Sequence, residues 1–149
     1  MSARLLTHVE FRSNRFPAFD GEEEMINPDL WGKLLADFLR EGLLLRGYDI
    51  PDALPEDWGW MLRISNQPFS MWIGCGHYQE YPDGFLCFIE PRKTRVWKGL
   101  KRIRTVETID ALKLAIDEVL VENAGFRSKK WWTYEEFNFP GKHGRLNDE

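Results

Sequence analysis

Three segments in the middle of this sequence follow one another with only short turns between them, and each has the composition of a β-strand. They span residues 58–65, 69–79 and 85–90. The turn Pro82-Asp83-Gly84 offers a proline that fixes φ and a glycine that can adopt the left-handed conformation. Strands joined by such short turns pair in antiparallel fashion. The sequence therefore predicts a three-strand antiparallel meander at the centre of the fold.

Two helices and two further strands are predicted around the meander. Asn27 has the character of an N-cap and Pro28 suits the first helical position, and a second helix begins at Thr105 or Thr108. The helices span residues 27–47 and 105–125, and the outer strands span residues 3–12 and 126–134. The order strand–helix–strand–strand–strand–helix–strand indicates an α+β fold, with both helices on one face of an antiparallel sheet.

The length of 149 residues is typical of one domain with a single core. We expect residues 1–137 to form a single α+β domain, and residues 138–149, which have no hydrophobic periodicity, to form a flexible tail. The basic segment 92–104 fits either a strand or an irregular helix.

The stretch IGCGHYQEYPDGFLCFI, residues 73–89, holds both cysteines and one of the three histidines. If the hairpin closes at Pro82-Asp83-Gly84, Cys87 lies opposite residue 78 or 79, which puts Cys75 roughly 10–13 Å farther along its strand. A disulfide needs Cα atoms within about 7 Å, so none is expected, nor is a zinc ion shared by the two thiols. We expect Cys75 to be a buried structural thiol and no metal to be bound.

Cys75 and His77 lie two apart in a strand and therefore share a face, which keeps a catalytic pair open as an alternative. The other face is predicted to pack aromatic rings over glycines. In the expected register Trp60 lies opposite Gly74, and the next pair along the strands is Trp58 and Gly76. The second interpretation of the motif EDWGW is an exposed rim that a partner binds. This rim comprises Glu56, Asp57 and Trp58.

The segments PEDWGWMLRI and MWIGCGHYQEYPDGFLCFIEP, and more loosely NPDLWGKLLADFL, are similar to segments of a group of small bacterial proteins whose function is unassigned. The resemblance covers roughly residues 16–136. It implies a bacterial, cytosolic, single-domain protein, and it brings no activity, cofactor or catalytic residue.

Charges are segregated along the chain, although the net charge is only −4. Residues 20–24 read DGEEE, whereas residues 92–104 contain seven lysines or arginines and no acid. Basic side chains around a tryptophan can hold phosphates while a base stacks on the ring, or can bind an acidic protein. The third interpretation is a solvated face whose charges pair with nearby acids. The candidate binding residues here are Arg95, Trp97, Lys98, Lys101 and Arg102.

The sequence contains no glycine-rich phosphate loop, GxSxG or HExxH motif, so we assign no catalytic residue and no cofactor. No segment is apolar enough for a signal peptide or a membrane span, and we expect a cytoplasmic protein. The leading hypothesis is a non-catalytic protein that engages another protein through a charged, tryptophan-rich surface, with an immunity or accessory protein as one concrete form. The alternatives are a nucleic-acid-binding accessory protein that uses residues 92–104, and an enzyme around Cys75 and His77. The oligomeric state is left open.

Overall fold

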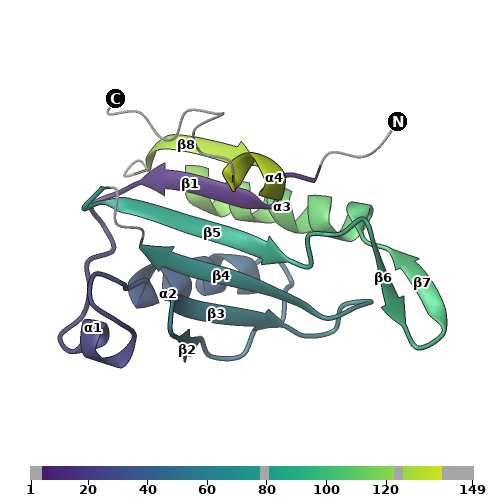
Figure 1. The fold of residues 1–149 in the computed structure, drawn as a ribbon, viewed down its shortest axis with the longest axis horizontal. Coiled ribbons are helices and arrows are strands. Elements are labelled where there is room, and N and C mark those ends of the chain that lie inside the picture. The colour runs from purple at the N-terminus through teal and green to yellow at the C-terminus, as the bar shows by residue number, and fades with distance from the viewer. Residues whose placement is uncertain (1–4, 78–80, 123–125, 139–149) are drawn as a thin grey trace.

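The computed structural model describes residues 5–77, 81–122 and 126–138. Six strands form an antiparallel sheet in the order β2-β3-β4-β5-β1-β8. Their bounds are β1 His8–Arg12, β2 Leu54–Glu56, β3 Gly59–Ile64, β4 Met71–His77, β5 Gly84–Glu90 and β8 Arg127–Trp132. Strands β3, β4 and β5 form the predicted meander (Figure 1), and the prediction of an α+β fold is confirmed.

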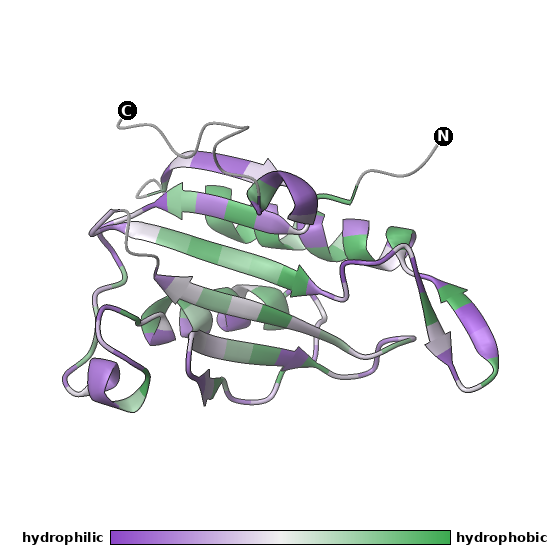
Figure 2. Cartoon of the chain, viewed as in Figure 1, coloured by the Kyte–Doolittle hydropathy of each residue, from purple (hydrophilic) through white to green (hydrophobic). Residues whose placement is uncertain are grey.

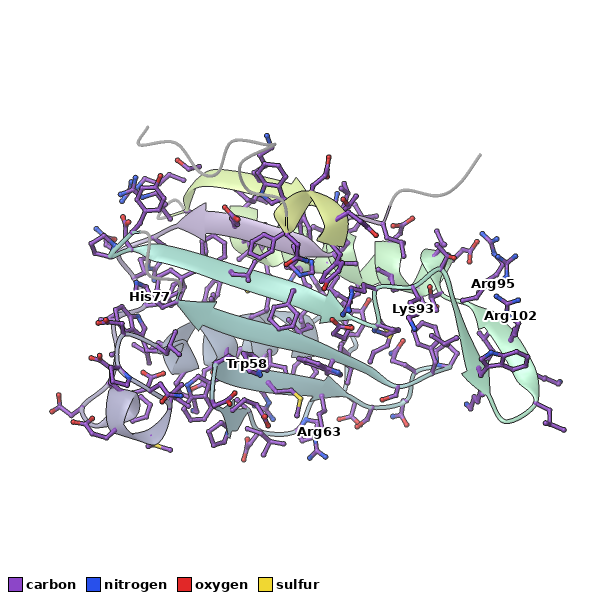
Figure 3. The ribbon with its side chains drawn as sticks, in the orientation of Figure 1. Trp58, Arg63, His77, Lys93, Arg95 and Arg102 are labelled. Atoms are coloured by element: carbon purple, nitrogen blue, oxygen red, sulfur yellow. The ribbon has the colours of Figure 1, made fainter. Side chains whose placement is uncertain are left out.

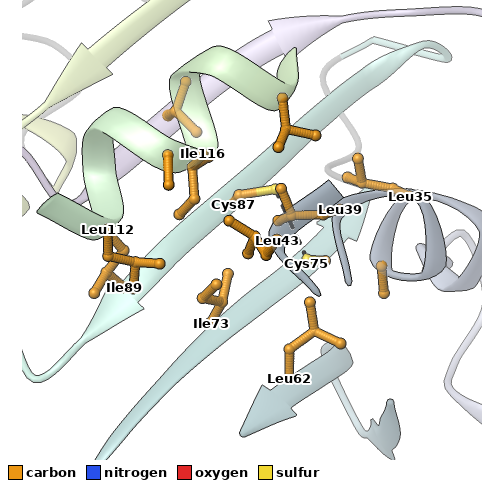
Figure 4. Packing of buried hydrophobic residues seen from close by; sticks show 14 of the residues in the cluster. Leu35, Leu39, Leu43, Leu62, Ile73, Cys75, Cys87, Ile89, Leu112 and Ile116 are labelled. Atoms are coloured by element: carbon orange, nitrogen blue, oxygen red, sulfur yellow. Dashed lines mark hydrogen bonds between the residues drawn. The ribbon is translucent and has the colours of Figure 1, made fainter. Parts of the chain in front are cut away.

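The two long helices, α2 (Lys33–Leu44) and α3 (Val106–Val121), cover one face of the sheet, as predicted (Figure 1). Their apolar sides pack on the inward side chains of the central strands, and Figure 4 shows this layer. The fully buried helix residues include Leu35, Leu39, Leu43, Ile109, Leu112 and Ile116. Strand β5 is hydrophobic along most of its length (Figure 2), because apolar side chains point from both of its faces.

Two short helices were not predicted. Helix α1 (Glu22–Met25) lies in the connection from β1 to α2, and α4 (Tyr134–Phe137) follows β8 on the face opposite α3 (Figure 1). Helix α4 begins with a capping box, in which Thr133 and Glu136 each accept a hydrogen bond from the other's backbone N–H. The predicted tail, residues 138–149, lies outside the described residues except for Asn138.

The helix predicted to begin at Asn27 begins instead at Lys33. The cap is not local: the Oε2 atom of Glu22 accepts the backbone N–H groups of Gly32 and Lys33, each at 2.8 Å. The Asn27 side chain donates to the carbonyl oxygen of Asp57 at 2.7 Å. The prediction of the start was wrong because a carboxylate ten residues upstream satisfies the N–H groups that an N-cap usually binds.

The register between β4 and β5 also differs from the prediction. Cys75 pairs with Cys87, and the pair nearest the turn is His77 with Phe85. The Sγ atom of Cys87 is 3.8 Å from that of Cys75, and both are free thiols. The prediction that Cys75 lies three or four residues beyond the position opposite Cys87 is therefore wrong.

The reason lies in the contacts of the Pro82–Gly84 turn. The Gly84 N–H does bond to the Tyr81 carbonyl oxygen at 3.1 Å, as in a β-turn. The Asp83 carboxylate binds the guanidinium groups of Arg12 and Arg127, so the turn is held against the end of β1. The turn therefore does not close the hairpin directly onto β4.

Between β3 and β4 the register is offset by one residue from the prediction. Trp60 pairs with Cys75 and Met61 pairs with Gly74. A shift of one residue moves a side chain to the other face of the sheet. Trp60 is consequently buried in the core, where its indole N–H donates to Glu22 at 2.8 Å.

Candidate binding surfaces

The ambiguous basic segment forms a separate two-stranded sheet, β6 (Arg95–Lys98) and β7 (Lys101–Arg104), which projects from one end of the main sheet (Figure 1). Its base is fixed next to α3. The Thr105 N–H donates to the Thr94 carbonyl oxygen at 2.9 Å, and the Thr105 hydroxyl donates to the carbonyl oxygen of Lys93. The hairpin is thus anchored to the core at its open end.

The register of the hairpin separates its side chains into two faces. Arg95 pairs with Arg104, Val96 with Ile103, Trp97 with Arg102 and Lys98 with Lys101. Directly paired residues share a face, and Val96 and Ile103 pack against the core cluster. The opposite face therefore points to solvent. We call this solvent-facing set, Arg95, Trp97, Arg102 and Arg104, the arginine face.

The arginine face carries a large exposed aromatic ring. Trp97 is 68% exposed, and the guanidinium of Arg102 lies 5.7 Å from the centroid of its ring. Arg104 pairs with Glu107 at 3.0 Å, whereas Arg95 and Arg102 form no ion pair with any described residue. Two guanidinium groups beside an exposed indole therefore remain available to a partner. The pairing of charges with nearby acids, considered above as a third interpretation, applies to Arg104.

The predicted candidates are not all brought together. Lys98 and Lys101 lie on the hairpin face opposite Trp97. The sequence prediction omitted Arg104, which the alternation of a strand would have assigned to the face of Trp97, and Leu100, which is 97% exposed at the tip. The rim lies away from the hairpin, as the positions of Trp58 and Arg102 in Figure 3 show.

The rim of Glu56, Asp57 and Trp58 lies at the turn between β2 and β3. Trp58 packs on Trp72 and Phe88, with ring centroids 5.8 and 5.3 Å apart. An aromatic ring does lie over Gly74, as predicted, but it is the ring of Phe88 and not that of Trp60. A Cβ atom at Gly74 would come within 2.3 Å of the Phe88 ring. Phe88 of β5 occupies the place predicted for Trp60.

Beside this aromatic cluster is a mainly apolar cavity of about 240 Å³. Its described lining residues are Trp58, Gly76, His77, Leu86 and Phe88. The carbonyl oxygen of Trp58 would lie 3.0 Å from a Cβ atom at Gly76, so a side chain at position 76 would crowd the backbone of Trp58. Trp58 is the one residue of the rim among the described lining residues.

The three acids at 22–24 lie in different environments. Glu22 is fully buried, and besides Gly32, Lys33 and Trp60 it accepts the backbone N–H of Phe19 at 3.0 Å. A buried carboxylate with four N–H donors has its hydrogen-bonding capacity met and is a structural element.

Cys75 and His77 share a face, as expected, but their surroundings do not suit a nucleophile and its base. Burial and the hydrogen bond from Cys87 raise the pKa of the Cys75 thiol, and the hydrogen bond is the larger cause. The reactive thiolate is thereby disfavoured. The His77 ring stacks on Trp31 with centroids 3.7 Å apart.

Both ring nitrogens of His77 face backbone carbonyl oxygens. Nδ1 lies 2.9 Å from the oxygen of Asp29 and Nε2 lies 2.9 Å from that of Tyr81. The imidazole therefore ties β4 to two loops. Across residues 5–77, 81–122 and 126–138, no three His, Cys, Asp or Glu side chains gather in a way that could hold a metal ion.

Comparisons with family models, with curated proteins and with solved structures found no match to this chain. None of the helices in the described part of the chain has the length and apolar character that crossing a bilayer requires.

Proposed function

We propose that this chain is a non-catalytic binding protein that engages an acidic surface of another protein through its arginine face. The observation that carries the proposal is the combination of the exposed Trp97 ring with the guanidinium groups of Arg95 and Arg102 on one solvent-facing side of a hairpin. Tryptophan and arginine are the residues most enriched among interface hot spots. Acidic groups on the partner would complement the arginine face.

Leu100 favours a protein partner over nucleic acid. Its side chain is 97% exposed at the tip of the hairpin. A phosphate backbone has no apolar surface against which an aliphatic side chain could pack, whereas a protein surface can provide an apolar pocket. The concrete form that we propose is a cytoplasmic bacterial protein of the immunity or accessory type. That form is supported by the sequence resemblance and by the net charge of −4.

Two matched double variants test the proposal. R95Q/R102Q removes two charges from the arginine face, and R15Q/R63Q removes two charges from exposed arginines elsewhere. Once affinity capture and mass spectrometry have identified a partner, calorimetry gives its Kd for each variant. We expect R95Q/R102Q to weaken binding at least about tenfold and R15Q/R63Q to change it by less than about twofold. Equal affinities for the two variants would overturn the proposal.

Single-stranded nucleic acid is the second candidate, because the exposed Trp97 ring is flanked by cationic side chains. Fluorescence anisotropy with a labelled single-stranded oligonucleotide separates the two. Affinity that falls steeply with salt and is lost in K98A/K101A/R102A supports this second candidate. If the oligonucleotide does not bind even at low salt, the nucleic-acid candidate is ruled out.

A further inference from the structure

Charged residues are separated in space as well as along the sequence. One end of the main sheet carries the loop around α1 and the β2–β3 turn, which the Asn27–Asp57 hydrogen bond joins. The acids of this end are Asp20, Glu23, Glu24, Asp29, Glu56 and Asp57. The hairpin at the other end carries Arg95, Lys98, Lys101, Arg102 and Arg104. In Figure 1 α1 lies at the end opposite the β6–β7 hairpin, and the β2–β3 turn also lies away from it; we call these two regions the acidic and the basic pole.

Each pole also carries an apolar feature that complements the other. The basic pole ends in Leu100, an aliphatic side chain with 97% of its surface exposed. The cavity of about 240 Å³ is lined by Trp58 and Phe88, and Asp57 precedes Trp58 in the chain. The exposed leucine lies on a basic hairpin, and the mainly apolar cavity includes Trp58 of the acidic rim, so the two can complement each other in polarity and in charge.

The two features cannot meet within one molecule. Strand β4 has seven residues and runs between the two poles, so roughly 20 Å of sheet separates the hairpin from the cavity. The hairpin is also anchored to the core through Thr94 and Thr105, so it does not swing back over the sheet. Any contact between Leu100 and the cavity must therefore be made between two chains.

We propose that the arginine face binds the acidic pole of a second copy of this chain. Leu100 of one copy enters the cavity of the next, while Arg95 and Arg102 lie against Glu56 and Asp57. This inference rests on the proposed function, because it assigns a partner to the same arginine face. The two contacting surfaces differ and lie at opposite ends, so the contact is head to tail, and it produces a ring or a chain of copies.

A charge swap tests the proposal most sharply. R95E/R102E reverses the charge of the arginine face in one variant, and E56R/D57R makes the rim of another variant basic. Sedimentation velocity at low salt over a wide concentration range should show self-association of the wild type, and each variant alone should associate at least about tenfold more weakly. An equimolar mixture of the two variants should associate again, because each reversed pole then meets an opposite charge. Failure of the mixture to associate would overturn the proposal.

A matched pair of variants tests the contribution of Leu100. L100D places a charge on the tip, whereas L45D makes the same change at another leucine that is 87% exposed. We expect L100D to abolish self-association and L45D to leave it unchanged, with circular dichroism confirming that both variants fold. Equal effects would mean that another surface is used. If the wild type remains monomeric but R95Q/R102Q still loses an identified protein partner, this inference fails while the proposed function stands.

Discussion

The thiols of Cys75 and Cys87 face each other across β4 and β5, with their sulfur atoms 3.8 Å apart. Both side chains are almost completely buried, and they lie among the leucines of α2 (Figure 4). The pair fills part of the layer between sheet and helix, where free cysteine behaves as a small apolar residue.

The pair should be inert in the folded protein. The raised pKa of Cys75 disfavours its thiolate, and neither sulfur is accessible to a reagent. Labelling with a chromogenic disulfide should therefore be far slower for the native protein than for the protein in concentrated guanidinium chloride, where both thiols react. A native-state rate equal to that of the unfolded control would contradict the buried pair and reopen the Cys75/His77 alternative.

Glu22→Gln should destabilise the fold by about 2–3 kcal/mol. The Oε2 atom of Glu22 accepts three N–H groups and its Oε1 atom accepts the Phe19 N–H, and an amide must present its own N–H₂ to at least one of these donors. Urea unfolding measures the loss. Glu24→Gln, at an exposed position of the same helix, is the control and should change the free energy of unfolding by less than about 0.5 kcal/mol. Similar losses in the two variants would contradict the role of Glu22 as a cap.

His8 should make the stability depend on pH. Burial, with a smaller contribution from the charge of Arg92, lowers the pKa of His8 from 6.5 to about 4. Between these values the unfolded chain binds a proton that the folded chain does not. The free energy of unfolding therefore keeps this contribution above pH 6.5 and loses about 3 kcal/mol as the pH falls towards 4.

The measurement is urea unfolding across this pH range for the wild type and for His8→Phe. The variant keeps an aromatic ring against Phe88 and Phe137, which lie 5.5 and 5.0 Å from His8 between ring centroids. It cannot titrate, so its loss of stability on acidification should be smaller. Parallel pH profiles for the two proteins would contradict the buried neutral imidazole.

Gly74→Ala should destabilise the protein by about 1–3 kcal/mol, because the added Cβ atom would meet the Phe88 ring at 2.3 Å. That ring cannot move freely, since Trp58 and Trp72 pack on it. A double-mutant cycle measured by urea unfolding supplies the control. In a Phe88→Leu background the same glycine substitution should cost less, and an unchanged cost would show that the two positions are not coupled.

The meander could be predicted from sequence because its signals are local. The β-strand composition of the three segments and the short turns between them all lie within one continuous stretch of the chain. The capping signal of α4, with Thr133 three residues before Glu136, was equally local and could have been found.

The registers and the start of α2 could not be predicted because they depend on distant partners. Asp83 of the turn is held by Arg12, which lies 71 residues earlier, and the residues of the turn alone do not reveal this partner. Glu22 caps a helix that begins at Lys33. The β6–β7 hairpin was ambiguous because its inward face offers only Val96 and Ile103 as an apolar pattern.

The central claim is that the arginine face is where this protein binds another protein. Its most direct test is site-specific photocrosslinking in cells that naturally contain the protein. A photoreactive amino acid at position 100 should give a discrete protein adduct that R95Q/R102Q removes, and the same amino acid at position 45, which is also highly exposed, should give none. Adducts of equal yield from both positions, or adducts with nucleic acid alone at position 100, would contradict the account.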